Sequence, residues 1–397
     1  MPVSRILIAN RGEIAVRIAR AAAVVGAECV TVFSEDDAAG PHIAAGDAAV
    51  PLAGHGPAAY LDAAGLVAAA RSAGCDAVHP GYGFLSENAA FARLCADAGL
   101  TFIGPDPAVL AVFGDKARAR RLAEDCGVPL VPGTGGPTSL EEATAFFHAL
   151  GDGAAVMVKA VAGGGGRGMR AVTDPADLPA AFDRCRSEAL AAFGGGDLYV
   201  EQLVRQARHI EIQIIGDGRS VAHLWERDCT LQRRHQKLVE IAPSPFLSAP
   251  VRDRIADAAV RLARAVGYAG LGTVECLVAD GPDPAFFFME TNPRLQVEHT
   301  VTEAVTGIDL VVAQILLAGG ATLADLRLEQ GDIPPPRGCA VQVRLNAETV
   351  TAAGEALPSC GTVTLYDPPT GPGVRVDTHL RSRSEERRVG KECRSRW

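Results

Sequence analysis

The most informative segment of the sequence is Lys159-Ala160-Val161-Ala162-Gly163-Gly164-Gly165-Gly166-Arg167-Gly168-Met169, which joins two predicted strands, Ala155–Ala160 and Met169–Val172. Four consecutive glycines allow backbone N–H groups to approach an anion closely, and Lys159 and Arg167 add positive charge. The segment lacks the Gly-Lys-Ser/Thr ending of a P-loop, and a strand follows it where a P-loop has a helix. It therefore predicts a phosphate-binding lid on a hairpin, with a plain flexible turn as the alternative.

Upstream of this segment, strand and helix patterns alternate. Strands are predicted at Ile6–Ala9, Cys29–Phe33, Ala77–His79 and Thr101–Ile103, and helices at Gly12–Val25, Leu61–Ser72 and Glu87–Ala98. This alternation predicts a parallel, doubly wound α/β sheet. A dinucleotide site would need Gly-x-Gly-x-x-Gly after the first strand, but only Gly12 is in place, which disfavours a dehydrogenase.

Downstream, glycine turns separate short strands, which favours an α+β domain. Helices are predicted at Lys116–Cys126 and Ala176–Ala191, and strands at Leu198–Leu203, His209–Ile215, Val221–Glu226, Gly272–Val278 and Phe286–Asn292. A proline-rich linker, Gly331–Gly338, marks a second boundary. Beyond it, Val341–Leu345 and Val374–His379 are predicted to be strands of a third domain.

Composition narrows the range of partners. The 397 residues carry a net charge of −9, which argues against nucleic acid or an anionic membrane as a partner. The longest apolar stretch, Ile308–Leu323, contains Asp309 and is typical of a buried helix rather than a membrane span. Ten cysteines without a Cys-x-x-Cys pair indicate a reducing compartment, and together with the absence of a signal peptide they predict a cytoplasmic protein.

The last seventeen residues, 381–397, differ from the rest. They hold seven Lys or Arg against three Glu and show no apolar periodicity. We expect this tail to be foreign to the protein and the third domain to be cut short, with a basic interaction tail as the alternative.

Two acidic strands and one basic segment are candidates for chemistry. Glu275 lies on one predicted strand, and Glu290 and Asn292 share a face of the next, which Arg294 would continue if the chain stayed extended. Two Glu and one Asn supply the oxygen ligands that Mg²⁺ prefers, although a charged strand end can be mere surface.

The segment Arg227–Lys237 gathers four basic residues and one histidine, which favours anion binding over a solvated charged face. His209 alternates with apolar neighbours, and a lone histidine in that pattern is usually structural. Ser86 or Glu87 is placed to begin the following helix, and capping alone would explain that segment.

Taken together, these segments resemble biotin carboxylase, the ATP-grasp subunit or domain of biotin-dependent carboxylases. The resemblance covers residues 3–380 and rests on Ile8–Ala15, His79–Asn88, Gly114–Lys116, Lys159–Met169, His209–Glu211, Gln232–Lys237, Asn292–His299 and Val343–Asn346. It implies an N-terminal α/β domain at 1–114, an ATP-grasp domain at 115–332 with a mobile lid at about 132–204, and a partial, β-rich C-terminal domain at 333–380.

The resemblance also implies the site residues. ATP would be held by Lys116, Lys159, Gly165, Gly166, Glu201, Gln202, Leu203, Val204, His209 and Gln232; Mg²⁺ or Mn²⁺ by Glu275, Glu290 and Asn292; and bicarbonate by Lys237, Arg294, Gln296 and Val297. Glu298 would be the general base that deprotonates bicarbonate. Its pKa would need to lie near the working pH; neighbouring cations would lower that pKa, and burial would raise it. Arg344 would stabilise the enolate-like oxygen of biotin, and Tyr82 and His235 would line that pocket.

Biotin would come from a partner, because no methionine of the chain precedes a lysine as the carrier motif requires. The implied partners are a biotin carboxyl carrier protein or domain and a carboxyltransferase, which would choose the final acceptor, and the parent would be a homodimer. Two rival interpretations remain: another ATP-grasp ligase of the carbamoyl-phosphate type, with an amine acceptor, and an inactive ATP-binding fragment.

Overall fold

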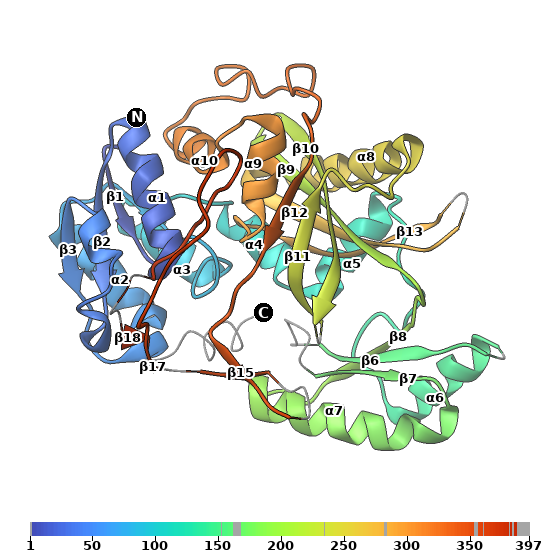
Figure 1. Cartoon of the computed structure of the whole chain (residues 1–397). Helices are drawn as coiled ribbons and strands as arrows, with labels where there is room; N and C mark the ends of the chain where they lie inside the picture. Colours follow the sequence, from blue (N-terminus) through green and yellow to red (C-terminus); the bar gives the residue numbers. More distant parts are fainter. Residues whose placement is uncertain are drawn as a thin grey trace.

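The structure is a computed structural model, which describes residues 2–151, 153–161, 168–233, 235–281, 284–352, 356–359, 361–380, 382 and 385–386. The glycine run that contains Gly165 and Gly166 lies outside the described residues, as does most of the basic tail. Three larger sheets account for most of the strands in the described part (Figure 1). The mixed α/β and α+β architecture confirms the predicted fold class.

The N-terminal sheet is parallel, with the order β3-β2-β1-β4-β5. Its strands are β1 (Arg5–Ile8), β2 (Glu28–Phe33), β3 (Ala48–Pro51), β4 (Ala77–His79) and β5 (Thr101–Phe102), and the associated helices are α1 (Gly12–Val25), α2 (Ala63–Ser72), α3 (Ala89–Asp97) and α4 (Pro107–Phe113). The strand order reverses between β1 and β4, and ligands bind at the carboxyl ends of strands flanking such a point. Gly81 follows β4 with φ +64, and a Cβ there would lie 3.0 Å from Asn10 Nδ2, so the loop needs glycine.

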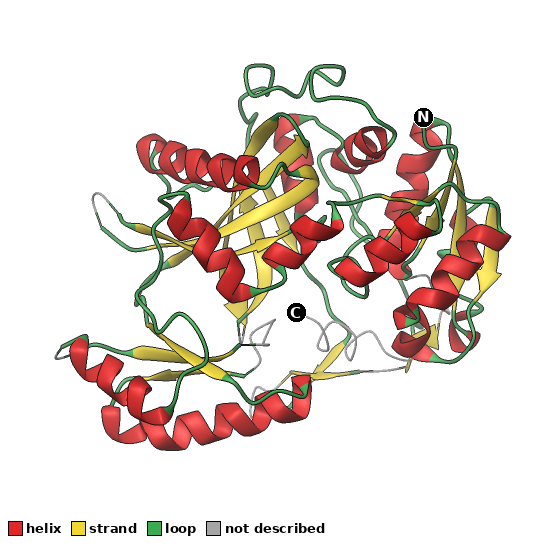
Figure 2. Ribbon diagram, turned by 180° about the vertical axis from the view of Figure 1, so that it is seen from behind, coloured by secondary structure: helices red, strands yellow, loops and turns green. Residues whose placement is uncertain are grey.

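A second, small antiparallel sheet lies in the part of the chain for which the sequence predicts a lid, and it is called the lid sheet below. Its order is β7-β6-β8, with β6 (Val156–Ala160), β7 (Met169–Val172) and β8 (Leu198–Gln202). Helices α6 (Leu140–Ala149) and α7 (Leu178–Phe193) pack on one face through Phe147 and Phe182 (Figure 2). The opposite face of β6 is therefore left to carry Lys159 toward the larger sheet.

The six-stranded sheet has the order β13-β12-β9-β10-β11-β14. Its strands are β9 (Arg208–Asp217), β10 (Val221–Arg233), β11 (Gln236–Ala242), β12 (Ala269–Val278), β13 (Phe286–Asn292) and β14 (Ala340–Val343). Along β9, Ile210, Ile212 and Ile214 pack with α8 (Ala249–Ala265) and α5 (Lys116–Asp125), whereas Glu211 points to the opposite face. The strand thus has an apolar face that builds the core and a polar face that builds the site.

Helices α9 (His299–Thr306) and α10 (Leu310–Ala318) follow this sheet, and the short strands β15 (Glu348–Val350), β16 (Ala356–Pro358), β17 (Gly361–Thr362) and β18 (Glu385–Glu386) end the described chain. Short 3-10 helices lie at Glu35–Asp37, Ile43–Ala45, Gly56–Leu61 and Pro175–Asp177. Among the described helices none is by itself long and apolar enough to cross a membrane, although the bent pair α9 and α10 passes on length and composition together.

The structure corrects three local predictions. Val374–His379 is not a strand, because its residues find no partner strand in the described chain and instead run along the cleft. Strand β3 was not predicted, since Ala48–Pro51 contains a single β-branched residue. Helix α3 is capped by Asn88, whose side chain accepts from Phe91 N–H, and not by Ser86 or Glu87.

Arg17 joins the N-terminal sheet to the helices of the larger sheet. Its guanidinium lies 2.8 Å from Glu303 Oε1 and 2.6 Å from Asp309 Oδ1, and its side chain is 7% exposed. Around this pair, α1 and α10 pack in one apolar cluster. The buried guanidinium of Arg17 therefore links the N-terminal sheet to α9 and α10 through Glu303 and Asp309.

We expect Arg17→Ala to lower the free energy of unfolding by about 3 kcal/mol or more, because it leaves the buried Glu303 carboxylate without this partner. Urea unfolding at pH 7 measures the change. Arg93→Ala, at an exposed position of α3, serves as the control and should change stability by less than about 0.5 kcal/mol. Equal effects of the two substitutions would contradict the role of Arg17.

Candidate active site

One cavity of about 1580 Å³ lies between the polar face of the six-stranded sheet, the lid sheet and the carboxyl ends of β1 and β4. Every predicted site residue that the structure describes lines it: Tyr82, Lys116, Lys159, Glu201, Gln202, Leu203, Val204, His209, Gln232, His235, Lys237, Glu275, Glu290, Asn292, Arg294, Gln296, Val297, Glu298 and Arg344. Residues separated by more than 250 positions thus share one cleft.

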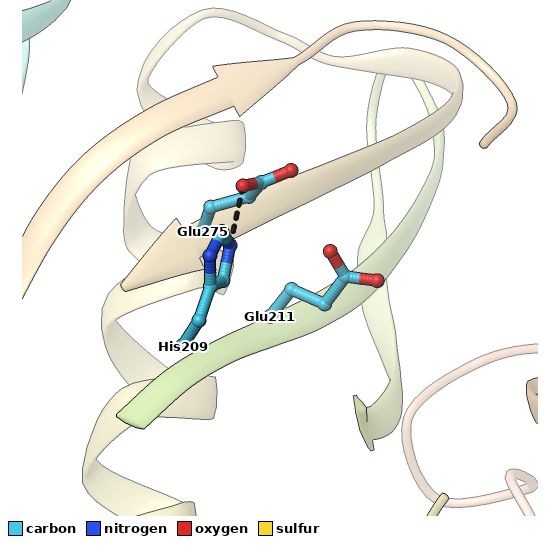
Figure 3. Close-up of side chains that lie close together, drawn as sticks. All are labelled: His209, Glu211 and Glu275. Carbon is cyan, nitrogen blue, oxygen red and sulfur yellow. Dashed lines mark hydrogen bonds and ion pairs between the residues drawn. The ribbon is translucent and has the colours of Figure 1, made fainter. Parts of the chain in front are cut away.

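Lys237, on β11, is the centre of the site. Its ammonium lies 2.6 Å from Glu211 Oε2, 2.8 Å from Glu275 Oε1 and 2.7 Å from Glu298 Oε1. Figure 3 shows Glu211 on β9 and Glu275 on β12 projecting side by side from neighbouring strands. Because the three carboxylates are almost fully buried, they need this shared cation.

The charged groups of this cluster shift one another's pKa values. Burial alone would raise the pKa of Glu298, but its cationic neighbours, led by Lys237, hold that pKa below its usual range. Burial would likewise raise the pKa of Glu275, but the Lys237 ammonium and the contact with His209 hold that pKa well below its usual range. Burial disfavours the charged form of Lys237, yet the carboxylates raise its pKa well above the usual value. The cluster is therefore ionised at neutral pH.

Arg344 extends the same network beyond β14. Its guanidinium NH2 lies 2.8 Å from Glu298 Oε2, and its Nε lies 2.6 Å from Glu240 Oε1 on β11. Glu298 is consequently held between one lysine and one arginine in the lining of the cleft. Burial raises the pKa of Glu240 to about 7, although Arg344 opposes that change.

Glu275, Glu290 and Asn292 have a donor set that fits Mg²⁺. Glu275 and Glu290 are opposite partners in the β12–β13 ladder, and Asn292 Nδ2 donates to Glu275 Oε1 at 2.8 Å and to Glu290 Oε1 at 3.4 Å. Two carboxylates and an amide on one face provide hard oxygen ligands with an open side toward the cavity.

A second grouping of possible ligands consists of His209, Glu211 and Glu275 (Figure 3). His209 Nε2 lies 2.5 Å from Glu275 Oε2, but the Lys237 ammonium already contacts both carboxylates of the group. A metal ion there would face that ammonium at short range, so these three residues fit an ion-pair network better than a metal site.

The lid sheet contributes cations at the other end of the cavity. Lys159 pairs with Glu201 on β8, and Arg120 of α5 contacts the same carboxylate at 2.5 Å. Lys116, at the start of α5, makes no ion pair with a described residue, and burial lowers its pKa. An unpaired, partly buried lysine facing a cavity fits a site for phosphate oxygens.

Arg294 reaches the cleft by a different route from the predicted one. Strand β13 ends at Asn292, and Arg294 N–H donates to Asn292 O at 2.9 Å, so the chain turns and does not stay extended. The guanidinium lies 2.6 Å from Glu87 Oε1 and 3.2 Å from Asn292 Oδ1. Arg294 nevertheless lines the cavity together with Gln296.

Tyr82 and His235 also line the cavity. The Tyr82 hydroxyl donates to Glu13, and His235 lies in the turn between β10 and β11 with φ +62. His209, which sequence reasoning left as a possible structural residue, instead bonds both Glu275 and the Gln232 amide, 2.9 Å from its Nδ1.

Sequence reasoning missed four residues of the network: Arg120, Glu211, Arg227 and Glu240. Glu211 shares a strand face with His209, which the alternation along β9 could have revealed. Arg227 is fully buried and contacts Glu211, Gln213 Oε1 at 2.7 Å and Thr302 Oγ1 at 2.9 Å. No local pattern marks Arg120 or Glu240, because their partners lie 81 and 104 positions away.

Comparison with known proteins identifies the family of this fold and site. Residues 2–110 match the family model "Biotin carboxylase, N-terminal domain", and residues 115–326 match "Carbamoyl-phosphate synthase L chain, ATP binding domain". The biotin carboxylase domain of a single-chain bacterial carboxylase is 51% identical with a TM-score of 0.84, and the alignment covers 96% of this chain and 80% of that one.

Two further relatives are informative. The biotin carboxylase domain of Hydrogenobacter thermophilus 2-oxoglutarate carboxylase, solved with MgADP, ADP and bicarbonate, is 41% identical with a TM-score of 0.91, covering 97% of this chain and 83% of that one. Pyruvate carboxylase of Bacillus subtilis is 46% identical over 383 residues, which are 95% of this chain and 33% of that protein. The chain belongs to the biotin carboxylase family, and it spans about a third of the length of the curated relatives it matches.

We expect Lys237→Met to destabilise the protein by about 3–5 kcal/mol at pH 7, because it leaves buried carboxylates without their shared cation. In the wild type the low pKa values of Glu275 and Glu298 stabilise the fold above their unfolded value of about 4.3, and this stabilisation is lost as the pH falls through the folded values. In the variant, burial raises these pKa values, so its stability falls as pH rises. The difference between the proteins should therefore narrow from pH 7 to pH 4.

Urea unfolding at several pH values measures this difference. Lys116→Met is the matched control, because it removes a cavity lysine that makes no ion pair with a described residue. It should show neither the loss of stability at pH 7 nor the narrowing of the difference from wild type toward pH 4. A difference between wild type and Lys237→Met that stays constant within about 0.5 kcal/mol across the range would contradict the account.

Proposed function

We propose that this chain carboxylates biotin, using ATP and bicarbonate, in the first half-reaction of a biotin-dependent carboxylase. The observation that carries the proposal is the placement of Glu298 between Lys237 and Arg344 in the same cleft as the unpaired Lys116. A base between two cations suits a small oxyanion, and the lysine at the far end suits a polyphosphate.

The nucleotide would bind in the part of the cavity that β6 and β8 line. Lys116 and Lys159 would contact phosphate oxygens, and Arg120 would keep Glu201 paired when Lys159 leaves that carboxylate for a phosphate. The backbone of Glu201, Gln202, Leu203 and Val204 would face the adenine, and His209 and Gln232 the sugar side. Gly165 and Gly166 belong to the proposed phosphate lid by sequence alone.

Mg²⁺ would be held by Glu275, Glu290 and Asn292. When bound, the metal neutralises phosphate charge during phosphoryl transfer. The residues themselves set its position, since Glu275 is fixed by hydrogen bonds from Asn292 and from Gln296 Nε2, the latter at 3.0 Å.

Bicarbonate would bind between Lys237 and Arg294, with Gln296 and Val297 beside it. An anion placed against these cations offsets their effect on Glu298 and thereby raises its pKa toward a value useful for a base. Glu298 would then take the bicarbonate proton, and the freed oxygen would attack the γ-phosphate to give carboxyphosphate and ADP. The site thus links substrate binding to activation of its base.

Carboxyphosphate would break down to CO₂ and phosphate, and the phosphate would remove the ureido proton of biotin. Arg344, with Arg294 nearby, would stabilise the negative charge on the ureido oxygen. Tyr82 and His235, which line the same cavity, would line the biotin pocket.

We propose further that biotin arrives on a carrier protein or domain and leaves to a carboxyltransferase, with domain limits at 114 and 332 and a homodimeric parent. The names of the relatives include carboxylases of pyruvate and of 2-oxoglutarate, so we assign only the biotin half-reaction to these residues. A cytoplasmic location is part of the proposal, and it is supported by eight free cysteines in the described chain.

The first test measures phosphate release from MgATP, omitting bicarbonate and free biotin in turn. We expect release to require both, because bicarbonate supplies the attacking oxygen and biotin accepts the carboxyl group. Release that needs bicarbonate and an amine, but not biotin, would favour the carbamoyl-phosphate type of ligase. ATP binding without any release would make the chain a nucleotide-binding fragment.

Glu298→Gln should lower biotin-dependent phosphate release by about 10²- to 10⁴-fold, the usual effect of removing a general base. The amide can still accept from Lys237, so the fold and ATP binding should be retained. Calorimetric titration with ATP checks binding, and the release assay checks turnover. Wild-type turnover in this variant would show that Glu298 is not the base.

A further inference from the structure

Glu240 is a buried carboxylate that the proposed chemistry does not use. It lies on β11 directly opposite Gln342 of β14, and its side chain is fully inaccessible to solvent. Its Oε1 accepts from Arg344 Nε at 2.6 Å, and its Oε2 has no hydrogen-bond partner among the described residues. Burying a carboxylate oxygen without a hydrogen-bond partner costs free energy. Glu240 is therefore a costly residue to bury, and its one side-chain hydrogen bond in the described part of the chain, from Arg344, is the feature that could account for its presence.

Arg344 is held at three points. Its backbone N–H donates to Leu238 O at 3.0 Å, its Nε donates to Glu240, and its NH2 donates to Glu298 Oε2 at 2.8 Å. The first two points belong to β11, which is hydrogen-bonded to β14 along the register Val239–Val343 to Ala242–Ala340. The guanidinium is therefore oriented by a rigid pair of strands and not only by Glu298.

Glu240 and Glu298, the two carboxylates that contact Arg344, have different roles in the proposed reaction. Glu298 takes a proton during the cycle, and a carboxyl oxygen that carries a proton donates a hydrogen bond instead of accepting one, so its contact with the guanidinium is not constant. Glu240 does not line the cavity, so substrates do not touch it. It can hold the guanidinium in place while the charge on Glu298 changes.

We propose that Glu240 is a positioning residue that fixes the guanidinium of Arg344 through its Nε, so that the remaining N–H groups face the oxygen of biotin. This inference rests on the proposed biotin carboxylation. Misplacement of a catalytic group by about 1 Å costs up to about 10²-fold in rate. The acceptor oxygen, and not the negative charge, is the feature of Glu240 that matters.

The test compares Glu240→Ala with Glu240→Gln. The alanine variant should lower kcat with free biotin by about 10- to 100-fold and leave the KM for ATP within about twofold, because the nucleotide end of the cavity is untouched. The glutamine variant keeps an acceptor oxygen and should recover kcat to within about threefold of wild type. Equal kcat in Glu240→Ala and wild type, or equal losses in both variants, would overturn the proposal.

Glu226→Ala provides the matched control. Like Glu240, Glu226 is a buried carboxylate of the same sheet that lies outside the cavity lining and whose Oε2 has no hydrogen-bond partner among the described residues, but it is not one of the residues that hold Arg344. This substitution should change stability and leave kcat unchanged. A loss of kcat equal to that of Glu240→Ala would show that burial of a carboxylate in this sheet, and not contact with Arg344, is what matters, which would overturn the proposal.

A spectroscopic readout separates this inference from the proposed function. The Nε–H resonance of Arg344, assigned by its loss in Arg344→Lys, should exchange slowly in wild type and in Glu240→Gln and should be lost to exchange in Glu240→Ala. Absence of biotin-dependent release in the wild type would overturn the proposed function alone, and the resonance would still test the contact. Persistence of the resonance in Glu240→Ala would overturn the positioning role.

Discussion

The Lys237 ammonium, shared by three buried carboxylates, is the interaction on which the site depends. Glu211, Glu275 and Glu298 come from β9, from β12 and from the start of α9, and each would repel the others without a cation between them. The cluster continues outward in alternating charges, to Arg227 behind Glu211 and to Arg344 beside Glu298. Buried charges of this kind specify geometry more than they stabilise the fold.

The fold makes this cluster possible by separating the two faces of one sheet. The isoleucines of β9 pack against α8 and form the core, and the alternate positions present carboxylates to the cleft. Lys159 of the lid sheet and Tyr82, which follows β4 of the parallel sheet, line the same cleft. We therefore propose that nucleotide, bicarbonate and biotin occupy one cavity, with Arg294 shared by the bicarbonate and biotin positions.

Sequence patterns predicted the local structure well where local forces decide it. Helix α1 has the predicted bounds, because Gly12 and the left-handed Gly26 flank an apolar periodic run. The acidic strands also predicted residues that line the cavity, whereas the glycine run lies outside the described residues. The pairing of Glu240 with Arg344 could not be predicted, because it joins residues 104 positions apart through the β11–β14 ladder, and only the first two residues of β11 belong to the basic segment Arg227–Lys237. Such contacts follow from tertiary packing, which no local pattern records.

The most direct test of the central claim, that this cleft activates bicarbonate against ATP, is isotope tracing. Phosphate released from MgATP in the presence of [¹⁸O]bicarbonate and biotin is analysed by mass spectrometry. The account predicts one ¹⁸O atom in each phosphate, because a bicarbonate oxygen attacks the γ-phosphorus and stays with it. Unlabelled phosphate would show that water is the nucleophile and would contradict the assignment of Lys237, Arg294 and Glu298 to bicarbonate.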